Sequence, residues 1–237
     1  MNVRNELAPS GNLRAGMNLG NTLFTRKNSL GELEGVSVDL MRELAKRLEV
    51  PLEMISFAQP GQVADASTKD MWDVAILAIE KTRAQTISFS PAMTEIEAGY
   101  VVHQNSVLLR PELVDAKGVK IAAPEKAAYE LYLTGSLKNA TLVRTANFAK
   151  SLEIFNHKEV DALAGLKPNL MESMHVLADA KLLDGNFMTV NHGFAVPLGR
   201  EAANAFLHHF VKELITSGFI SRSIENHQIK GLKAIKE

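Results

Sequence analysis

Hydrophobic and polar positions in the first hundred residues follow two alternating patterns. Residues 12–18 (NLRAGMN) and 52–57 (LEMISF) read as strands, and residues 73–79 (DVAILAI) form a largely apolar run typical of a buried strand. Apolar positions recur at helical spacing from 40 to 48, with Asp39 as the expected N-cap. Strands that alternate with helices predict βαβ units and a largely parallel sheet.

The same alternation restarts after Tyr100. The stretches TKDMWDVAILAIEK and NHKEVDALAGLKP each pass from a polar turn through an aspartate into an apolar strand of small residues that ends near a lysine. This weak internal echo predicts two similar lobes. The elements expected here are strands at 119–123, 141–144 and 160–166, helices at 129–137, 147–155 and 219–226, and a further helix that carries Phe206, Phe210 and Leu214.

Composition excludes several classes of function. The chain has 237 residues, a net charge of -1 and no dense run of lysine or arginine, so the electrostatic footprint of a nucleic-acid-binding protein is missing. It has no cysteine, which excludes disulfides, thiolate metal sites and cysteine nucleophiles. No apolar run reaches the ~20 residues that a membrane-spanning helix needs. The histidines lie in no metal-binding motif, so neither a metal nor another cofactor is expected.

An arginine follows the buried strand at 73–79. In open α/β sheets, ligands bind beyond the carboxyl ends of the strands, and Arg83 lies just past such an end. Its planar guanidinium suits a carboxylate, to which it can donate two parallel hydrogen bonds. The alternative is an ordinary surface arginine at the exit of a strand. The residue alone does not separate these two interpretations.

Five segments follow one another in a characteristic order: NLRAGMN, GELEGVSVDLMRELAKRLEVPLEMISF, WDVAILAIEKTRAQTISFSP, EAGYVV and KELITSGFISRSIEN. This order resembles that of the periplasmic solute-binding proteins of polar amino-acid ABC importers, the type II proteins of solute-binding family 3. The likeness covers almost the whole chain. It implies a two-lobed α/β fold with a central cleft, in which residues 1–102 and 193–237 form lobe 1 and residues 103–192 form lobe 2.

The resemblance also implies a mechanism and a setting. A small solute is expected to bind in the cleft by hinge closure, with an ABC permease as the partner, and the protein is expected to be a monomer without enzyme activity. No secretion signal is visible in residues 1–20. A periplasmic location therefore requires that a signal was removed, and a cytoplasmic one that Met1 is the native start.

The resemblance assigns candidate site residues in the first lobe. The spacing of Ile79, Arg83 and the FSP at 89–91 matches the family pattern, in which the arginine grips the carboxylate of the ligand. The loop LGNTLF matches the family's ligand-stacking loop. Phe24 is therefore a candidate for the aromatic ring that stacks on the ligand, and Asn21 and Thr22 are candidates for polar contacts with it. Glu80 stands where the family usually has threonine. Its side chain points either into water or into the cleft, where it would compete with an anionic ligand for the guanidinium of Arg83.

The second lobe departs from the family pattern. Its strand at 160–166 ends on Leu166 and Lys167, where the family has an aspartate for the ligand's ammonium group, and the turn APEKAAY lacks the usual hydroxyl. An ammonium group buried against leucine would cost several kcal/mol. The expected solute is therefore a carboxylate or another anion without an amino group. Lys126 and Lys167 are its candidate partners, unless both are solvated surface residues.

Two other classes of function stay open. Some proteins of this fold are dehydratases of cyclic acids, similar to cyclohexadienyl dehydratase, and such an enzyme would need Glu80 or Glu125 as a general acid. A sensor or interaction module would instead act through its outer surface. Turnover of a cyclic hydroxy acid would favour the enzyme, and capture of a protein partner without solute binding would favour the module.

Overall fold

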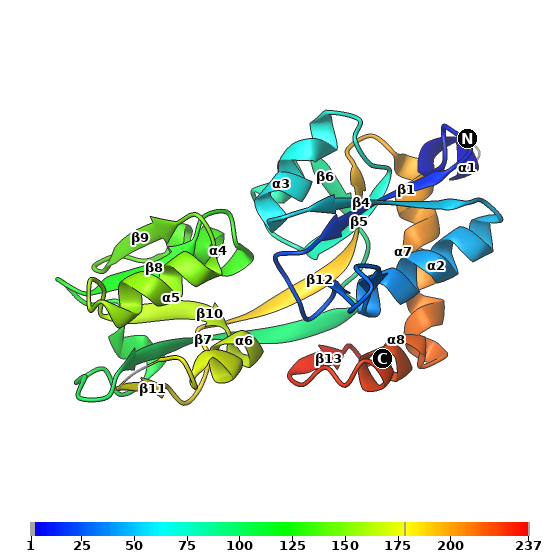
Figure 1. The fold of residues 1–237 in the computed structure, drawn as a ribbon. Helices are drawn as coiled ribbons and strands as arrows, with labels where there is room; N and C mark the ends of the chain where they lie inside the picture. The colour runs from blue at the N-terminus through cyan, green and yellow to red at the C-terminus, as the bar shows by residue number, and fades with distance from the viewer. Residues whose placement is uncertain (1–2, 178, 237) are drawn as a thin grey trace. The chain divides into compact units, whose positions relative to one another are not determined.

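The computed structural model describes residues 3–177 and 179–236. The chain divides into two compact units (Figure 1). Unit 1 comprises Met1–Glu95 and Asn191–Glu237, and unit 2 comprises Ile96–Val190. Each unit is a mixed α/β structure in which the sequence expectation of parallel strands joined by helices is met. The boundaries expected for the functional lobes, at 102/103 and 192/193, stay a prediction.

Unit 1 is built on parallel strands in the order β4-β1-β5, with β12 antiparallel beside β5 and β6 antiparallel to β12. Because the connections from β1 to β4 and from β4 to β5 cross the sheet in opposite directions, right-handed crossovers place α2 and α3 on opposite faces (Figure 1). The strands are β1 (Leu13–Asn18), β2 (Arg26–Lys27), β3 (Leu33–Glu34), β4 (Leu52–Phe57), β5 (Val74–Ala78), β6 (Ile87–Phe89), β12 (Met188–Pro197) and β13 (Leu232–Ala234). The helices are α1 (Val3–Leu7), α2 (Val36–Leu48), α3 (Pro60–Asp65), α7 (Glu201–Thr216) and α8 (Phe219–Asn226), with 3-10 turns at Ala66–Thr68 and Arg83–Gln85.

The start of α2 differs from the sequence expectation. Asp39 is not the N-cap, because the helix begins directly after Gly35. Gly35 has a φ of 120°, and a Cβ there would lie 2.4 Å from the carbonyl oxygen of Phe24, so a side chain is excluded. Asp39 lies one turn inside the helix. Its carboxylate accepts hydrogen bonds from Ser223 Oγ at 2.7 Å and from His227 Nε2 at 2.9 Å, which ties α2 to α8.

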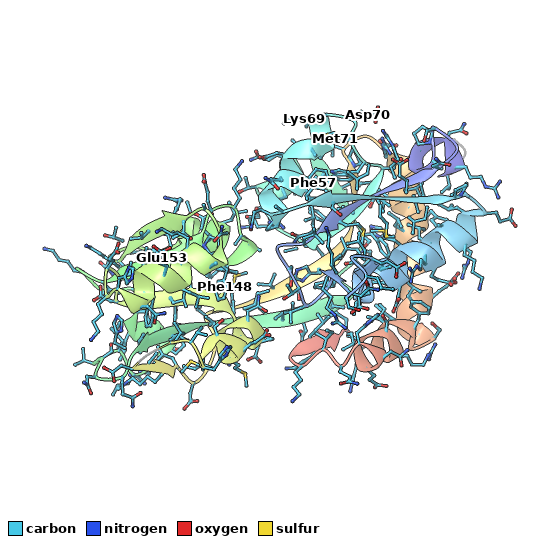
Figure 2. All side chains as sticks on the ribbon, viewed as in Figure 1. Phe57, Lys69, Asp70, Met71, Phe148 and Glu153 are labelled. Atoms are coloured by element: carbon cyan, nitrogen blue, oxygen red, sulfur yellow. The ribbon has the colours of Figure 1, made fainter. Side chains whose placement is uncertain are left out.

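An ion network around the buried Asp73 fixes the entry to β5. Asp73 is fully buried and accepts from Arg14 Nε at 2.9 Å and from Arg200 Nη1 at 2.8 Å. Asp70, labelled in Figure 2 beside Lys69 and Met71, accepts from Arg14 Nη2 at 2.7 Å. The two arginines come from β1 and from the residue before α7. The network therefore sets the position of β5, whose carboxyl end carries the candidate site residues of unit 1.

Unit 2 has strands in the order β7-β10-β8-β9, with β11 antiparallel to β7. β10, β8 and β9 run parallel, and β10 is antiparallel to β7. The strands are β7 (Thr94–His103), β8 (Lys120–Pro124), β9 (Thr141–Thr145), β10 (Ala162–Leu166) and β11 (Ala180–Leu182). The helices are α4 (Ala128–Ser136), α5 (Phe148–Asn156) and α6 (Lys167–Ser173), with a 3-10 turn at Pro111–Leu113.

The core of unit 2 forms where α5 and α6 pack on β10. Phe155 is fully buried, and its ring stacks on that of His103 with centroids 4.2 Å apart. A Cβ at Gly165 would lie 2.9 Å from Leu170 Cδ2 and 3.0 Å from Phe148 Cε2, so a glycine lets both helices approach the strand. Phe148 is labelled at the start of α5 in Figure 2. This close packing fixes the end of β10, from which α6 begins.

Candidate functional site

The carboxyl ends of β1, β4 and β5 meet at one edge of unit 1. The backbone N–H of Leu19 donates to the carbonyl oxygen of Phe57 at 2.9 Å, so the loop after β1 starts beside the end of β4. Asn21 is nine-tenths buried in this loop, and its side-chain oxygen accepts from the N–H of Leu23 at 3.3 Å. Its main-chain oxygen accepts from the N–H groups of Phe24 and Thr25. Asn21 thus shapes the loop.

Phe24 anchors the same loop. Its side chain is 3% exposed, and its ring lies 4.6 Å from the ring of His192, centroid to centroid. His192 stands opposite Ala78 in the register of β12 and β5, so this contact brings the loop beside the end of β5. The carbonyl oxygen of Phe24 also accepts from the N–H of Ser37 in the first turn of α2. The ring is therefore part of the core next to the candidate site.

Glu80 and Arg83 follow the end of β5. The Oε2 atom of Glu80 accepts from the backbone N–H of Thr82 at 2.7 Å and from that of Arg83 at 3.2 Å, and so it satisfies the start of the 3-10 turn. Arg83 is 5% exposed, and its Nη1 donates to the carbonyl oxygen of Ala78 at 3.1 Å. The structure thus holds the guanidinium back against the last residue of the strand.

Burial dominates the electrostatics of Arg83. Desolvation lowers the pKa of its guanidinium to about 10, and the negative charge of Glu80 opposes that shift. A positive group in such surroundings has lost much of its hydration, so a further negative charge beside it would stabilise the charged form.

The end of β10 forms the corresponding edge of unit 2. Leu166, its last residue, is buried and stands opposite Ala98 in the register with β7. Lys167 begins α6, and its Nζ lies 2.8 Å from Oε2 of Glu97, with side-chain exposures of 21% and 36%. A Cβ at Gly99 would lie 3.2 Å from Lys167 Cγ, so the lysine stem crosses β7 over that glycine.

The turn between β8 and α4 lies at the same edge. Lys126 is exposed and has a φ of 60°, a left-handed conformation that is uncommon for a residue with a side chain. Its N–H donates to Oε2 of Glu130 at 2.9 Å. Glu130 is buried, and its Oε1 accepts from Thr134 Oγ1 at 2.7 Å and from Arg144 Nε at 2.8 Å. Glu125 is exposed, and its N–H donates to the carbonyl oxygen of Thr145.

The structure groups the predicted site residues within each unit. Arg83 and Glu80 adjoin in unit 1, whose other two candidates lie in the loop after β1. In unit 2, Lys126 and Lys167 follow the carboxyl ends of β8 and β10. Sequence reasoning missed Glu97 and Glu130. Two glutamates just before the apolar run AGYVV were the available signal for Glu97, whereas nothing in the sequence marked Glu130.

The described residues contain neither a metal-binding cluster nor a membrane-spanning helix. Residues 3–177 and 179–236 contain no group of three or more histidines, aspartates or glutamates placed to hold a metal ion. None of the helices in these ranges is long and apolar enough to cross a membrane. His208 and His209 are exposed neighbours on α7.

Comparison with known proteins gives consistent matches. The family model described as bacterial extracellular solute-binding proteins, family 3, matches residues 13–228. The histidine-binding periplasmic protein of Escherichia coli (strain K12) is 26% identical over 122 residues, which cover 51% of this chain and 46% of that protein. The chain therefore spans about half the length of the curated relatives that it matches.

Solved structures match over a larger share of the chain. Holo ArgBP from T. maritima has a TM-score of 0.75 at 20% identity, covering 94% of this chain and 99% of that one. The ancestral amino acid-binding protein AncCDT-1, a precursor of cyclohexadienyl dehydratase, has a TM-score of 0.78 at 18% identity, covering 97% and 100%. At these identities the likeness establishes the fold, which is that of the two-lobed binding proteins.

Proposed function

Because the chain belongs to the bacterial extracellular solute-binding proteins of family 3, we propose that it is the solute-binding component of an ABC importer for a small carboxylate-bearing or otherwise anionic solute. The observation that carries the proposal is the guanidinium of Arg83, which is buried at the carboxyl end of β5 and whose pKa desolvation lowers to about 10. A planar carboxylate can accept two parallel hydrogen bonds from such a group.

The second unit supports a solute that lacks an amino group. The buried residue at the end of β10 is Leu166, which offers no acceptor to an ammonium group. The neighbouring carboxylate, Glu97, is already paired with Lys167. A simple carboxylic acid or a 2-oxo acid therefore fits this edge better than the corresponding α-amino acid. The competing solute is an amino acid, since the curated relative from Escherichia coli is a histidine-binding protein.

A role in transport implies further properties of the protein. Closure of the two units on the solute and delivery to an ABC permease stay predictions, as does the contribution of each candidate residue. A periplasmic location is proposed because the curated relative is a periplasmic protein. Turnover of a cyclic hydroxy acid is the alternative outcome, and it would be recognised by product formation that is lost in Glu80→Gln.

A thermal-shift screen of carboxylates, 2-oxo acids, amino acids and sugars tests the proposed function. A solute at 100 times its Kd stabilises the folded state by ~2.7 kcal/mol, which raises the melting temperature by several degrees in a protein of this size. We expect the shifts to come from solutes with an acidic group. If only sugars raise the melting temperature, the proposed function is wrong.

A further inference from the structure

A groove lies between α2 and α8 in unit 1, where the two helices pack against each other (Figure 1). Its volume is about 370 Å³, which is within the range of pockets that take small organic molecules. The residues that line it from α2 recur at helical spacing and so form one face of that helix. They are Asp39, Arg42, Glu43 and Lys46, and the opposite wall from α8 carries Phe219 and Arg222. These residues differ from the candidate site residues at the end of β5, so the groove is a second location in the same unit.

Two hydrogen bonds join the walls of this groove. The Oδ2 atom of Asp39 accepts from Ser223 Oγ at 2.7 Å and from His227 Nε2 at 2.9 Å. Ser223 is buried and lines the groove, so its bond holds α8 against α2 from the inside. The carboxylate of Asp39 therefore serves to hold the two helices together and to keep the groove in shape.

Three cationic side chains line the same space. Arg42 and Lys46 are exposed and lie four residues apart on α2, and Arg222 comes from α8. The Nη1 atom of Arg222 donates to the carbonyl oxygen of Ser217 at 2.7 Å, which restrains the guanidinium beside the groove. Within residues 3–177 and 179–236, Arg42 and Lys46 form no hydrogen bond or ion pair with another described residue. Like charges four residues apart destabilise a helix, so an anion beside these two side chains would be stabilising.

The other lining groups limit the kind of anion. Glu43 is a second carboxylate beside Asp39, so the three cations outnumber the carboxylates of the groove. Phe219 is partly buried and supplies an apolar surface. The volume is larger than a phosphate group alone would fill, which leaves room for a small organic body against this ring. The groove therefore suits a ligand that combines a doubly charged head with a short carbon skeleton.

We propose that the groove between α2 and α8 binds a small phosphomonoester, whose phosphate lies among Arg42, Lys46 and Arg222. A phosphate group accepts paired hydrogen bonds from the planar guanidinium of an arginine, and a lysine adds a compact positive charge. The carbon skeleton of the ester packs against Phe219. The ester is either a free metabolite or the headgroup of a lipid such as phosphatidate. This site does not depend on which solute binds at the end of β5.

Calorimetric titration of the full chain tests the proposal with glycerol 3-phosphate, inorganic phosphate and glycerol, and sedimentation with phosphatidylcholine vesicles, with and without phosphatidate, tests the lipid source. We expect Arg42→Gln and Arg222→Gln each to weaken binding of the ester by about fivefold. Glu43→Gln should strengthen it by about threefold, because it removes a like charge. The matched control is Lys69→Gln, which removes one positive charge from an exposed residue labelled in Figure 2 and should leave the affinity unchanged. Added salt should weaken binding, since the site is open to solvent.

The pattern across the variants decides the outcome. Binding of glycerol 3-phosphate that weakens in the two arginine variants but not in Lys69→Gln supports a soluble ester, and binding to phosphatidate vesicles alone with the same pattern supports a lipid headgroup. If inorganic phosphate binds as tightly as glycerol 3-phosphate, the groove holds an adventitious ion only and the proposal is wrong. Absence of binding to both esters, or equal binding by the wild type and the arginine variants, would also overturn it. Should an arginine variant fail to fold by circular dichroism, Glu43→Gln still decides, because its expected effect has the opposite sign.

Discussion

A glutamate and a cationic residue stand near the carboxyl end of a central strand in both units, but they interact in different ways. Glu80 and Arg83 are three positions apart, yet the carboxylate binds backbone N–H groups and the guanidinium binds the carbonyl oxygen of Ala78. Glu97 and Lys167 are far apart in the sequence, yet they form a 2.8 Å ion pair. The described contacts of the two side chains in unit 1 are thus to the backbone, whereas the two side chains in unit 2 contact each other.

This difference assigns different tasks to the two edges. We propose that the guanidinium of Arg83, at the end of β5, binds the acidic group of the solute. Lys167 is instead paired with a carboxylate, Glu97, beside the buried Leu166. We therefore expect substitutions in unit 1 to change whether a solute binds, and substitutions in unit 2 to change which solute binds.

Removal of the arginine should have the largest effect. Arg83→Ala leaves the carboxylate of a bound solute without its partner, which typically costs ~3–5 kcal/mol and lowers affinity more than a hundredfold. Arg83→Lys keeps the charge without the planar pair of donors and should lose less. The control is Arg26→Ala, which breaks an ion pair with Glu34 on the surface of the same unit. Undiminished binding by Arg83→Ala, measured by calorimetry, would show that the acid binds elsewhere.

The pH dependence of affinity should report the same group. Burial depresses the pKa of Arg83 to about 10, so the guanidinium is charged at neutral pH and loses its proton as the pH rises through about 10. Affinity for an acid should be constant from pH 7 to 9 and should then fall, approaching about tenfold per pH unit well above the pKa. Titrations from pH 7 to 11 check this dependence. A flat profile to pH 11 would mean that the charge on Arg83 is not required.

The role of Glu80 can be separated from that of an ion-pair partner. Glu80→Ala removes the acceptor of two backbone N–H groups and should lower the free energy of unfolding by ~1 kcal/mol, as the loss of a helix cap does. Glu80→Gln retains an acceptor oxygen and should cost much less. If Gln were as costly as Ala in urea unfolding, the negative charge of Glu80, and hence its interaction with Arg83, would be the main contribution.

The smallest effect is expected at the glycine under the lysine. Gly99→Ala places a Cβ 3.2 Å from Lys167 Cγ, and the flexible stem can move away, so the loss of stability should be ~0.5 kcal/mol with a small shift in solute preference. Gly135→Ala in α4 is the matched control. Its Cβ would meet nothing within 4 Å, and the change should be neutral or stabilising. Equal urea unfolding curves for Gly99→Ala and the wild type would show that the lysine does not depend on this glycine.

Much of the fold could be predicted from local pattern. The apolar run at 73–79 became β5, all of whose residues are buried, and the helix expected at 219–226 has those bounds. Such elements follow from periodicity, since their own residues decide them. The start of α2 could not be predicted in this way. Gly35 ends the preceding segment because the carbonyl oxygen of Phe24 lies against it, and that contact depends on how a distant loop folds back.

In the candidate site, too, contacts between segments that are far apart in the sequence could not be predicted. Arg83 could be nominated from its position after a buried strand, because the order of segments identified the edge of the sheet. The partner of Lys167 could not be nominated, because Glu97 lies 70 positions earlier and meets it only through the pairing of β7 with β10. The burial of Phe24 against His192 also depends on the return of β12, which brings residue 192 beside Ala78.

Calorimetry of the wild-type protein with a 2-oxo acid and the amino acid of the same side chain tests the central claim most directly. The claim is that Arg83 requires an acidic group and that the edge of unit 2, with Leu166 and the pair of Lys167 and Glu97, refuses an amino group. We expect the 2-oxo acid to bind at least about tenfold more tightly than its amino acid partner. Tight binding of an ordinary α-amino acid, with weak or no binding of its 2-oxo analogue, would contradict the account.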